Sequence, residues 1–397
     1  MPLPPLVKPG AALTAAERDR YARHVTLPAL GSEGQRRLKN ARVLVVGAGG
    51  LGSPVLLYLA AAGVGTIGIV DCDDVEESNL QRQVLHATAD VGQRKTTSAR
   101  DAVEALNPLV QVHLHDLRLD AATALDTLRG YDLVIDGTDN FATRYLVNDA
   151  CVLLGLPLVW GSIYRFDGQT TLFWADPPAG HGYTGVHYRD VFPEPPAPGT
   201  VPSCAEGGVL GVLCGAIGSV MANEAVKLIT GIGEPLLGRF LTFDALSTRW
   251  REIPVRPDPR RAPIGPLADI AVSCAVPPPT PVAAAHLISA ERLAERLADR
   301  ARGTDDFDLV DVREQHEHDE VAIPGARLVP RGEFLDGSAL RALDPHRPLI
   351  LHCRSGSRSA DVLDLARAAG FDAVHLDGGI LAWVTAFGPP APHPEPA

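Results

Sequence analysis

One short stretch of the chain combines three glycines with an apolar run before them. Gly47, Gly49 and Gly52 form the pattern G-x-G-x-x-G. They follow an apolar run at 43–46 that is typical of a buried strand, and a helix is expected from about Ser53. Glycine permits a tight turn and lets backbone amides approach a phosphate, while the helix offers its positive N-terminal end. The pattern predicts a nucleotide site but leaves the nucleotide open.

A second reactive stretch is the loop Cys353-Arg-Ser-Gly-Ser-Arg358. It follows an expected strand at 349–352 and precedes a helix expected from about 359. Loop amides, the helix N-terminus and the arginines Arg354 and Arg358 would all stabilise a thiolate on Cys353. We therefore expect a reactive cysteine here rather than an inert one at a strand end.

Charged residues after the glycine loop decide between two nucleotides. In a nicotinamide enzyme the loop and Asp71, which can accept ribose hydroxyls, would suffice. ATP carries more charge, so its site needs cations and a carboxylate for Mg²⁺. Arg82 and Lys95 can supply the cations, Asn79 a neutral donor and Asp139 the carboxylate. Each alone has an ordinary structural explanation, such as a solvated surface residue or a turn former. Together they favour ATP with Mg²⁺.

These residues lie at the ends of predicted strands that alternate with helices. Ligands of open α/β sheets collect outside such strand ends. The Pro- and Gly-rich segment 176–203 has no periodicity and is typical of a lid or binding loop. The other expected elements are a helical region at 14–40, strands at 66–70, 110–113, 132–135, 158–161, 169–175 and 309–312, and helices at 95–106, 121–128, 290–302 and 359–369.

Composition limits the class of protein. A chain of 397 residues can form two or three domains. The balance of 36 basic and 48 acidic residues argues against nucleic-acid binding. The N-terminal residues show no signal pattern, so we expect a cytoplasmic protein. The apolar stretch 209–226 contains many glycines and ends near charged residues, which favours a core or dimer-interface helix over a membrane span. The six cysteines form no C-x-x-C pair and are expected to be free thiols.

Several separated motifs in the first part of the chain resemble the ThiF/MoeB adenylyltransferases, the bacterial relatives of ubiquitin-activating enzymes. The resemblance covers about residues 14–250. It is carried by the glycine loop, by Ser78-Asn-Leu-Gln-Arg82-Gln, by Lys95 and by Thr138-Asp-Asn140. It implies a homodimer that binds Mg-ATP and the C-terminal Gly-Gly tail of a ubiquitin-like sulfur carrier protein. The tail carboxylate would attack the α-phosphate, giving an acyl-adenylate and pyrophosphate.

The resemblance also implies roles for individual residues. Gly50 would line the nucleotide, Asp71 would hold the ribose, and Asn79, Arg82 and Lys95 would contact phosphates. Asp139 would hold magnesium. Arg23 would reach the phosphates from the other subunit. The full expected nucleotide-binding set is Gly47, Gly49, Gly50, Gly52, Asp71, Ser78, Asn79, Leu80, Gln81, Arg82, Lys95, Asp139 and Asn140.

Cys204 precedes a glycine-rich helix start, where a helix dipole can stabilise a thiolate. The alternative is a small buried hydrophobe, but the position matches the reactive cysteine of the family, so we expect a chemical role. One departure concerns zinc, which many relatives bind with two C-x-x-C pairs. His187-Tyr-Arg-Asp190 stands in place of the first pair and no second pair is present. A closed site needs four ligands, so we expect no structural zinc.

The C-terminal part resembles a rhodanese domain over about residues 286–388. The motifs are the Cys353 loop, Leu309-Val-Asp311-Val-Arg313-Glu, Ile323-Pro-Gly-Ala and Gly378-Gly-Ile-Leu-Ala-Trp383. Ala322 stands where many rhodaneses have His. Related phosphatases place Cys and Arg one residue further apart to surround a phosphate. The tighter loop here fits sulfur better, which favours a persulfide carrier over ester hydrolysis. The predicted persulfide loop is Cys353, Arg354, Ser355, Gly356, Ser357 and Arg358.

The expected fold class is therefore α/β, with a Rossmann-like ThiF/MoeB domain built on a mainly parallel sheet and a smaller α/β rhodanese domain. The tandem order resembles MoeZ-type fusions. We expect Cys353 persulfide, loaded by a donor such as a cysteine desulfurase, to attack the acyl-adenylate, and a second thiol such as Cys204 to release a thiocarboxylate. The expected divisions are an adenylyltransferase domain at 14–253, a Pro-rich linker at 254–285, a rhodanese domain at 286–388 and a disordered tail at 389–397.

Two alternatives stay open at this point. The chain could form a Cys204 thioester and conjugate the carrier to proteins. It could also be a nicotinamide-dependent enzyme with a regulatory rhodanese module, which Arg82, Lys95 and Asp139 disfavour. The residues do not distinguish carriers of the molybdopterin, thiamine, cysteine and tRNA-thiolation routes.

Overall fold

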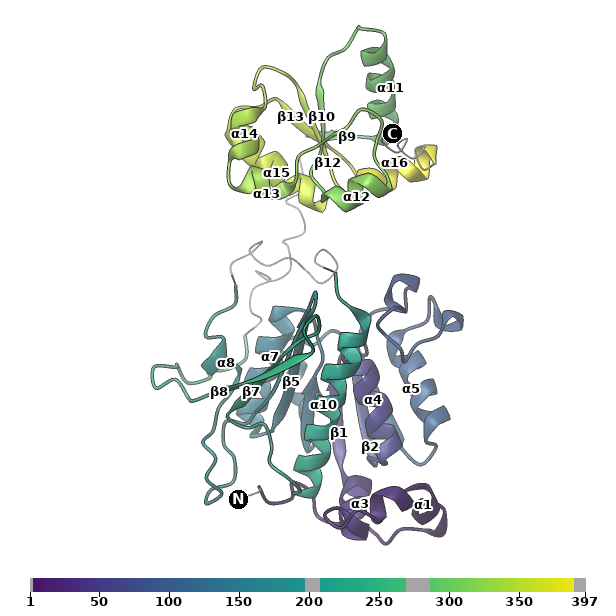
Figure 1. Cartoon of the computed structure of the whole chain (residues 1–397), viewed down its shortest axis with the longest axis vertical. Coiled ribbons are helices and arrows are strands. Elements are labelled where there is room, and N and C mark those ends of the chain that lie inside the picture. Colours follow the sequence, from purple (N-terminus) through teal and green to yellow (C-terminus); the bar gives the residue numbers. More distant parts are fainter. Residues whose placement is uncertain (1–2, 197–207, 269–285, 389–397) are drawn as a thin grey trace. The chain divides into compact units, whose positions relative to one another are not determined.

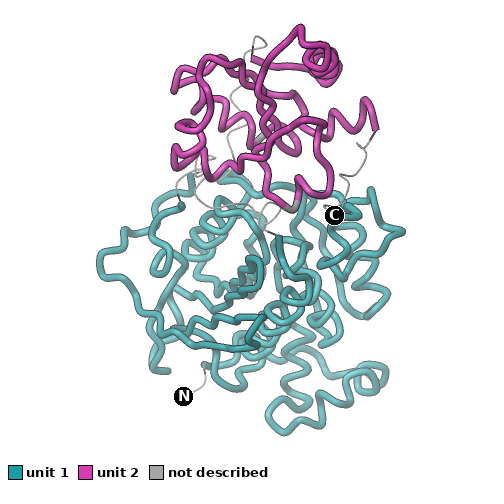
Figure 2. The backbone as a smooth tube through the Cα atoms, turned by 45° about the horizontal axis from the view of Figure 1, so that its top comes forward, with its two compact units in different colours: residues 1–276 teal, residues 277–397 magenta. Residues whose placement is uncertain are grey.

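The computed structural model describes residues 3–196, 208–268 and 286–388. The chain divides into two compact units, residues 1–276 and 277–397, coloured teal and magenta in Figure 2. The predictions made for Cys204 and for the tail at 389–397 lie outside the described residues, as does most of the predicted linker.

The first unit contains one large sheet with the strand order β3-β2-β1-β4-β5-β6-β7-β8. Pairing is parallel from β3 to β5 and antiparallel from β5 to β8. The inner strands are apolar over most of their length because helices cover both faces of the sheet. The strands are β1 Arg42–Val46, β2 Thr66–Asp71, β3 Gln111–Asp116, β4 Leu133–Asp136, β5 Leu158–Tyr164, β6 Asp167–Phe173, β7 Arg239–Asp244 and β8 Arg249–Pro254.

The strand order reverses between β1 and β4. The chain runs outward from β1 to β2 and β3, then returns to place β4 on the other side of β1. Loops that follow β1 and β4 therefore diverge and leave a crevice between them. Gly47 has a φ of 94°, and a Cβ there would lie 3.3 Å from the backbone of Gly137, so the two loops touch at a point where only glycine fits.

Helices cover the two faces of this sheet, as Figure 1 shows, with α4, α5 and α10 on one face and α7 on the other. Two adjacent residues of β5 show that successive side chains of a strand face opposite sides of the sheet. The Trp160 ring lies against Tyr188, whereas a Cβ on Gly161 would lie 2.4 Å from the Met221 sulfur of α10. The helices are α1 Ala15–Arg20, α2 Ala22–Val25, α3 Gly31–Asn40, α4 Gly52–Ala62, α5 Lys95–Leu106, α6 Ala124–Leu128, α7 Phe141–Leu154, α8 Tyr188–Val191 and α10 Gly211–Thr230.

Two local predictions for this unit need correction. The helical region expected at 14–40 is three helices. Pro28, which cannot donate a backbone hydrogen bond, lies in the break between α2 and α3. The capping box of Thr14 and Glu17 does start α1. The predicted linker began at Pro254, but that residue ends β8, and the backbone of Val255 donates to Gly238.

Helix α10 is, within the described ranges, the one helix whose length and composition alone would let it cross a membrane. Core helices of globular proteins pass the same test. Leu213, Ile217 and Met221 on α10 are buried against the sheet, so the helix completes the core of this unit.

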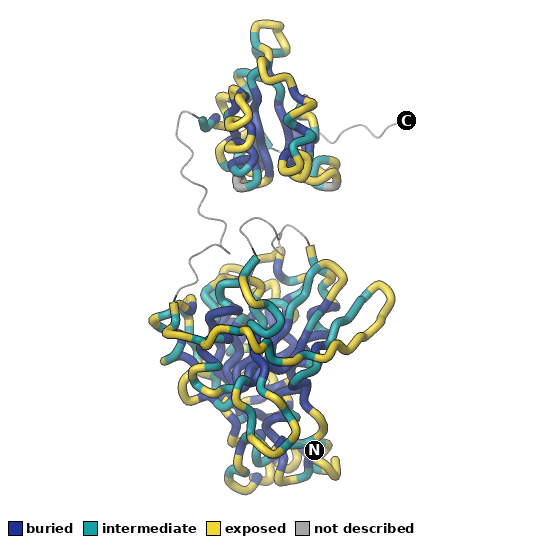
Figure 3. Tube along the Cα trace, turned by 90° about the vertical axis from the view of Figure 1, so that its left-hand side faces the viewer, coloured by how far each residue is buried: buried dark blue, intermediate teal, exposed yellow. Residues whose placement is uncertain are grey.

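The second unit is a five-stranded parallel sheet in the order β11-β10-β12-β13-β9. Two successive residues of β10 belong to different hydrophobic cores. Leu309 belongs to the cluster with α11 and α16, and Val310 to the cluster with α13 and α15. Both layers appear as buried bands in Figure 3. The elements are β9 Leu287–Ile288, α11 Ala290–Ala301, β10 Asp308–Asp311, α12 Gln315–Glu320, β11 Arg327–Leu328, α13 Arg331–Leu335, α14 Ser338–Ala342, β12 Leu349–His352, α15 Ser357–Ala368, β13 Ala373–Leu376 and α16 Gly379–Phe387. The α/β fold class is confirmed.

Candidate active sites

A cavity of about 540 Å³ opens at the carboxyl ends of β1, β2 and β4. Eight of the predicted nucleotide-binding residues line it: Gly47, Gly49, Gly50, Asp71, Arg82, Lys95, Asp139 and Asn140. The remaining predicted residues do not line it: Gly52, Ser78, Asn79, Leu80 and Gln81. Arg23 lies on α2 with an exposed side chain and is also not part of the wall.

Gly52 acts on the cavity through the backbone. A Cβ at this position would lie 1.9 Å from the carbonyl oxygen of Gly47. No side chain can be accommodated there, because the obstructing atom belongs to the backbone of the same loop. Gly52 therefore allows α4 to begin directly behind the loop, which aims the helix N-terminus at the cavity.

The Ala48 peptide is held from both sides. Its N–H donates to Asp71 Oδ2 at 2.8 Å, and its carbonyl lies 2.9 Å from His86 Nε2. Burial lowers the pKa of His86, so the ring is neutral at pH 7. A carbonyl oxygen only accepts, so Nε2 carries the proton. Nδ1 lies 2.7 Å from Ser98 Oγ, whose hydroxyl donates to Asp90 Oδ2 at 2.8 Å. Sequence reasoning missed His86, although it stands seven residues beyond the expected donor Asn79.

His86→Leu should raise the KM for ATP by about tenfold, because the buried Ala48 carbonyl of the loop loses the N–H that His86 donates to it. The KM for the second substrate should change less. Steady-state kinetics of ATP-dependent activity measure this, with His113→Leu on the exposed face of β3 as the matched control. An unchanged KM for ATP in a folded His86→Leu protein would contradict the role.

The two predicted cations are held differently. Lys95 is buried, and its Nζ lies 3.0 Å from Asp73 Oδ2. The backbone of Asp73 in turn donates to Asp71 Oδ1 at 2.9 Å. Arg82 is half-buried and donates to the Ser78 carbonyl at 3.2 Å. Both cations face the cavity, so they can meet a polyphosphate there. Asp73, which keeps Lys95 in position, was not identified from the sequence.

The end of β4 supplies acidic and polar groups. Asn140 caps α7 by accepting from the Thr143 amide at 2.8 Å. Asp139 lines the cavity. Mg²⁺ usually takes one or two protein carboxylates and completes its octahedron with phosphate and water oxygens, so a single carboxylate at this place fits Mg²⁺ bound with a nucleotide. No group of three or more His, Cys, Asp or Glu side chains able to hold a metal was found among the described residues.

A buried acid and a buried base brace this strand end. Asp136 is fully buried, accepts from the Thr138 hydroxyl at 2.7 Å, and has its pKa raised by burial. Arg144 donates to the Thr138 carbonyl at 2.9 Å and also lines the cavity. Neither residue was singled out from the sequence. Both residues bond to Thr138, and this contact forms only when the strand end and α7 are folded.

The residues that replace a family zinc motif have other partners. His187 and Asp190 form the capping box of α8. Asp190 also pairs with Arg261 and accepts from the Asp258 amide at 2.8 Å. This ion pair holds the segment after β8 against α8. The absence of structural zinc stays a prediction.

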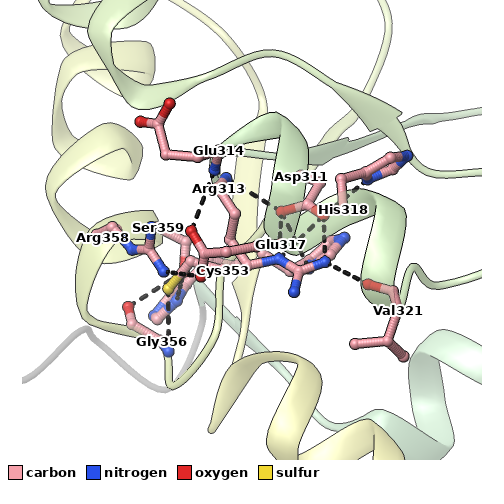
Figure 4. Close-up of polar contacts among 12 residues, drawn as sticks. Asp311, Arg313, Glu314, Glu317, His318, Val321, Cys353, Gly356, Arg358 and Ser359 are labelled. Carbon is pink, nitrogen blue, oxygen red and sulfur yellow. Dashed lines mark hydrogen bonds and ion pairs between the residues drawn. The ribbon is translucent and has the colours of Figure 1, made fainter. Parts of the chain in front are cut away.

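The second site is the loop between β12 and α15, drawn in Figure 4. Cys353 is buried, and its sulfur accepts from the Gly356 amide at 3.2 Å and from Ser359 Oγ at 3.5 Å. Helix α15 begins at Ser357, directly behind the sulfur. Amide, hydroxyl and helix N-terminus are thus arranged around one sulfur atom, and such an arrangement favours a thiolate or persulfide.

The sequence suggested that Arg358 stabilises a thiolate on Cys353, but in the structure its guanidinium is paired with another residue. Both of its terminal nitrogens lie 2.7 Å from the carboxylate of Glu317 on α12. Although burial acts to raise the pKa of Glu317, the bonds from Arg358 bring it below its usual range. The guanidinium charge is therefore largely compensated by a neighbour, while Arg354 is exposed. The hydrogen bonds to the Cys353 sulfur come instead from the Gly356 amide and the Ser359 hydroxyl.

A buried polar cluster lies beneath this loop. Arg313 forms a double hydrogen bond with Asp311, and His318 Nδ1 lies 2.9 Å from the same carboxylate. His352, the residue before Cys353, is fully buried, and burial lowers its pKa to about 4. Burial thus keeps His352 neutral at pH 7, although the Asp311 carboxylate, 3.9 Å from its Nδ1, acts to raise this pKa. The sequence motif contained Asp311 and Arg313 but did not reveal this cluster.

Ser359→Ala should slow sulfur transfer by about tenfold or more, since a hydrogen bond to a charged sulfur would be lost. Ser359 Oγ lies between Cys353 Sγ and His375 Nδ1, which is 3.2 Å away. The assay is thiocyanate formation from thiosulfate and cyanide. Ser338→Ala, away from the loop, is the matched control. A Ser359→Ala rate equal to the control rate would contradict the contact.

Comparison with known proteins gives two family matches. The ThiF family model matches residues 21–263, and the rhodanese-like domain model matches residues 289–386. Each match covers one of the two sites.

Two similar proteins are named as adenylyltransferases. The probable adenylyltransferase/sulfurtransferase MoeZ of Mycobacterium tuberculosis is 56% identical over 390 residues, covering 98% of each chain. The sulfur carrier protein adenylyltransferase of Thermus thermophilus is 58% identical over 247 residues, covering 62% of this chain and 90% of that protein. The solved structure of E. coli MccB matches with a TM-score of 0.53 at 23% identity, covering 63% of this chain and 73% of that one, and shows the fold alone.

Proposed function

Because the chain belongs to the ThiF family and carries a rhodanese-like domain after it, we propose that it adenylylates the C-terminal glycine carboxylate of a ubiquitin-like sulfur carrier and then converts it to a thiocarboxylate. The family assignment made from the motifs is confirmed, and the enzyme class is adenylyltransferase and sulfurtransferase. The observation that carries the proposal is one cavity that joins a glycine loop to Arg82, Lys95 and Asp139.

The first step brings two anions together. A carboxylate oxygen of the carrier attacks the α-phosphorus of ATP, and pyrophosphate leaves with the electron pair of the broken P–O bond. Lys95 and Arg82 would neutralise the phosphates, which lowers the repulsion and stabilises the leaving group. Asp71 would accept ribose hydroxyls. Magnesium, held through Asp139, would add charge neutralisation on the phosphate oxygens.

The second step transfers sulfur. The terminal sulfur of Cys353 persulfide attacks the acyl carbon, and AMP leaves with the electron pair of the C–O bond. A second thiolate then attacks the Cys353 sulfur, which releases the thiocarboxylate and leaves a disulfide. An external thiol reduces that disulfide. We assign the second thiolate to Cys204. The Gly356 amide and Ser359 would stabilise negative charge on Cys353.

The finer assignments belong to the same proposal. We propose a cytoplasmic homodimer in which Arg23 reaches the phosphates of the other subunit. A cysteine desulfurase would load Cys353. The remaining predicted loop and turn residues would act mainly by shaping the nucleotide pocket: Gly47, Gly52, Ser78, Asn79, Leu80 and Gln81.

The test is ATP–pyrophosphate exchange with a ubiquitin-fold protein ending in Gly-Gly, followed by mass spectrometry of that protein. Exchange that requires the carrier supports adenylylation. A mass gain equal to the replacement of one oxygen by sulfur supports transfer. A carrier adduct on Cys204 that passes to other proteins would instead support conjugation. The absence of exchange with every such carrier would refute the proposal.

A further inference from the structure

Gln83 is a buried polar residue of the cavity wall to which the steps above give no role. Its side chain is 4% exposed and lines the cavity beside Arg82. Its Oε1 has no hydrogen-bond partner in the part of the chain that the structure describes. Its Nε2 lies against the glycine loop, 3.6 Å from the position of a Cβ on Gly49.

The backbone fixes this side chain in place. The Gln83 amide donates to the Asn79 carbonyl at 2.9 Å, and the Gln83 carbonyl accepts from the His86 amide at 3.1 Å. Both bonds belong to the turn that follows the 3₁₀ segment Glu77–Asn79. The side-chain amide is therefore held at the cavity, and a buried acceptor left without a donor is costly.

The two ends of a carboxamide need different partners. Nε2 donates, and a phosphate or carboxylate oxygen can accept from it. Oε1 accepts, and neither a phosphate nor a carboxylate offers it a hydrogen. A ligand that satisfies both ends must present an N–H close to an acceptor oxygen. The last residue of a peptide does this, because its amide N–H lies one carbon away from its carboxylate.

Adenine also presents both a donor and acceptors. However, Gln83 lies against Gly49 and beside Arg82, which is assigned to the phosphates, while Asp71 is assigned to the ribose. The base attaches to the ribose on the side away from the phosphates. The position of Gln83 therefore favours the reacting carboxylate end of the peptide over the base.

We propose that Gln83 binds the terminal residue of the acceptor tail, with Oε1 accepting from its amide N–H and Nε2 donating to its carboxylate. This inference rests on the proposed adenylylation. Gln83 is then a binding residue that selects a peptide C-terminus over other carboxylates. It also orients the attacking oxygen toward the α-phosphorus, next to the loop.

The experiment uses the full-length enzyme and a semisynthetic carrier whose terminal glycine is replaced by glycolate. This change converts the N–H into an ester oxygen and leaves the carboxylate intact. Wild-type enzyme should lose about tenfold or more in kcat/KM for exchange with the ester carrier, the usual effect of an unsatisfied buried acceptor. Gln83→Leu should have a low kcat/KM that is the same for both carriers. Its KM for ATP should be unchanged. Gln93→Leu, at an exposed glutamine outside the cavity, should discriminate like wild type.

The outcomes separate the two proposals. No exchange by wild-type enzyme with the normal carrier would overturn the proposed function itself. Normal exchange in which Gln83→Leu keeps the wild-type preference for amide over ester would overturn this inference alone. A Gln83→Leu protein whose main defect is a higher KM for ATP would also overturn it, and would place the nucleotide at Gln83.

Discussion

Replacing Cys353 with serine should abolish thiocarboxylate formation while ATP–pyrophosphate exchange continues at the wild-type rate. Removal of a catalytic nucleophile typically costs a factor of about 10³ or more. A serine oxygen can still accept from the Gly356 amide, so the loop should keep its conformation, but it cannot carry a persulfide. The two sites belong to units with separate hydrophobic cores, so the first site should be unaffected.

Mass spectrometry of the carrier and the exchange assay, run on the same preparation, measure the two activities. Cys151→Ala is the matched control, because it removes a buried thiol of α7 that lies in the other unit. Thiocarboxylate formation by Cys353→Ser at the rate of the control would mean that the sulfur comes from another residue or directly from the donor.

Lys95→Met should reduce ATP–pyrophosphate exchange by about 10²-fold or more, the usual effect of removing one charged group that stabilises a transition state. Methionine keeps much of the apolar stem but removes the positive charge. The loss also leaves Asp73 without its cation at 3.0 Å, so a negative charge would face the phosphates. Thiosulfate sulfurtransferase activity should not change.

A double variant separates these two contributions. Lys95→Met with Asp73→Asn should recover part of the exchange activity, because the unpaired carboxylate is gone while the missing cation is not restored. Lys8→Met, at an exposed position near the N-terminus, is the control for loss of a lysine. Exchange by Lys95→Met at the control rate would show that the phosphates do not meet Lys95.

The sequence predicted the parts of the first site that follow directly from strand ends. Asp71 and Asp139 each come at or just after the end of an apolar run, so their place at one edge of the sheet could be inferred. Arg144 and Gln83 could not be assigned in this way. Each lies within or beside a local motif, and only tertiary packing decides whether its side chain faces the cavity or the core.

Strand β8 was not among the strands predicted from the sequence, and the reason is also physical. In β8 every residue is exposed, so the segment Arg249–Pro254 has no buried face to impose an alternating apolar pattern. At the second site, the local loop predicted the chemistry of Cys353. The partner of Arg358 is Glu317, 41 residues earlier in the chain. A pair this distant in sequence has no local signature.

The ion pair between Asp190 and Arg261 attaches part of the predicted linker to the first unit. Asp258 and Arg261 are bonded to Asp190, so this part of the predicted linker belongs to the first unit, and a connection between the units would begin after Arg261 and not at Pro254. The effective concentration of one tethered group around another depends on tether length. A connection that begins after Arg261 contains fewer residues than one that begins at Pro254, so it would raise the local concentration of the Cys353 sulfur around an acyl-adenylate in the proposed reaction. In the proposed reaction, the Asp190–Arg261 ion pair would therefore influence how often the activated carboxylate and the sulfur meet.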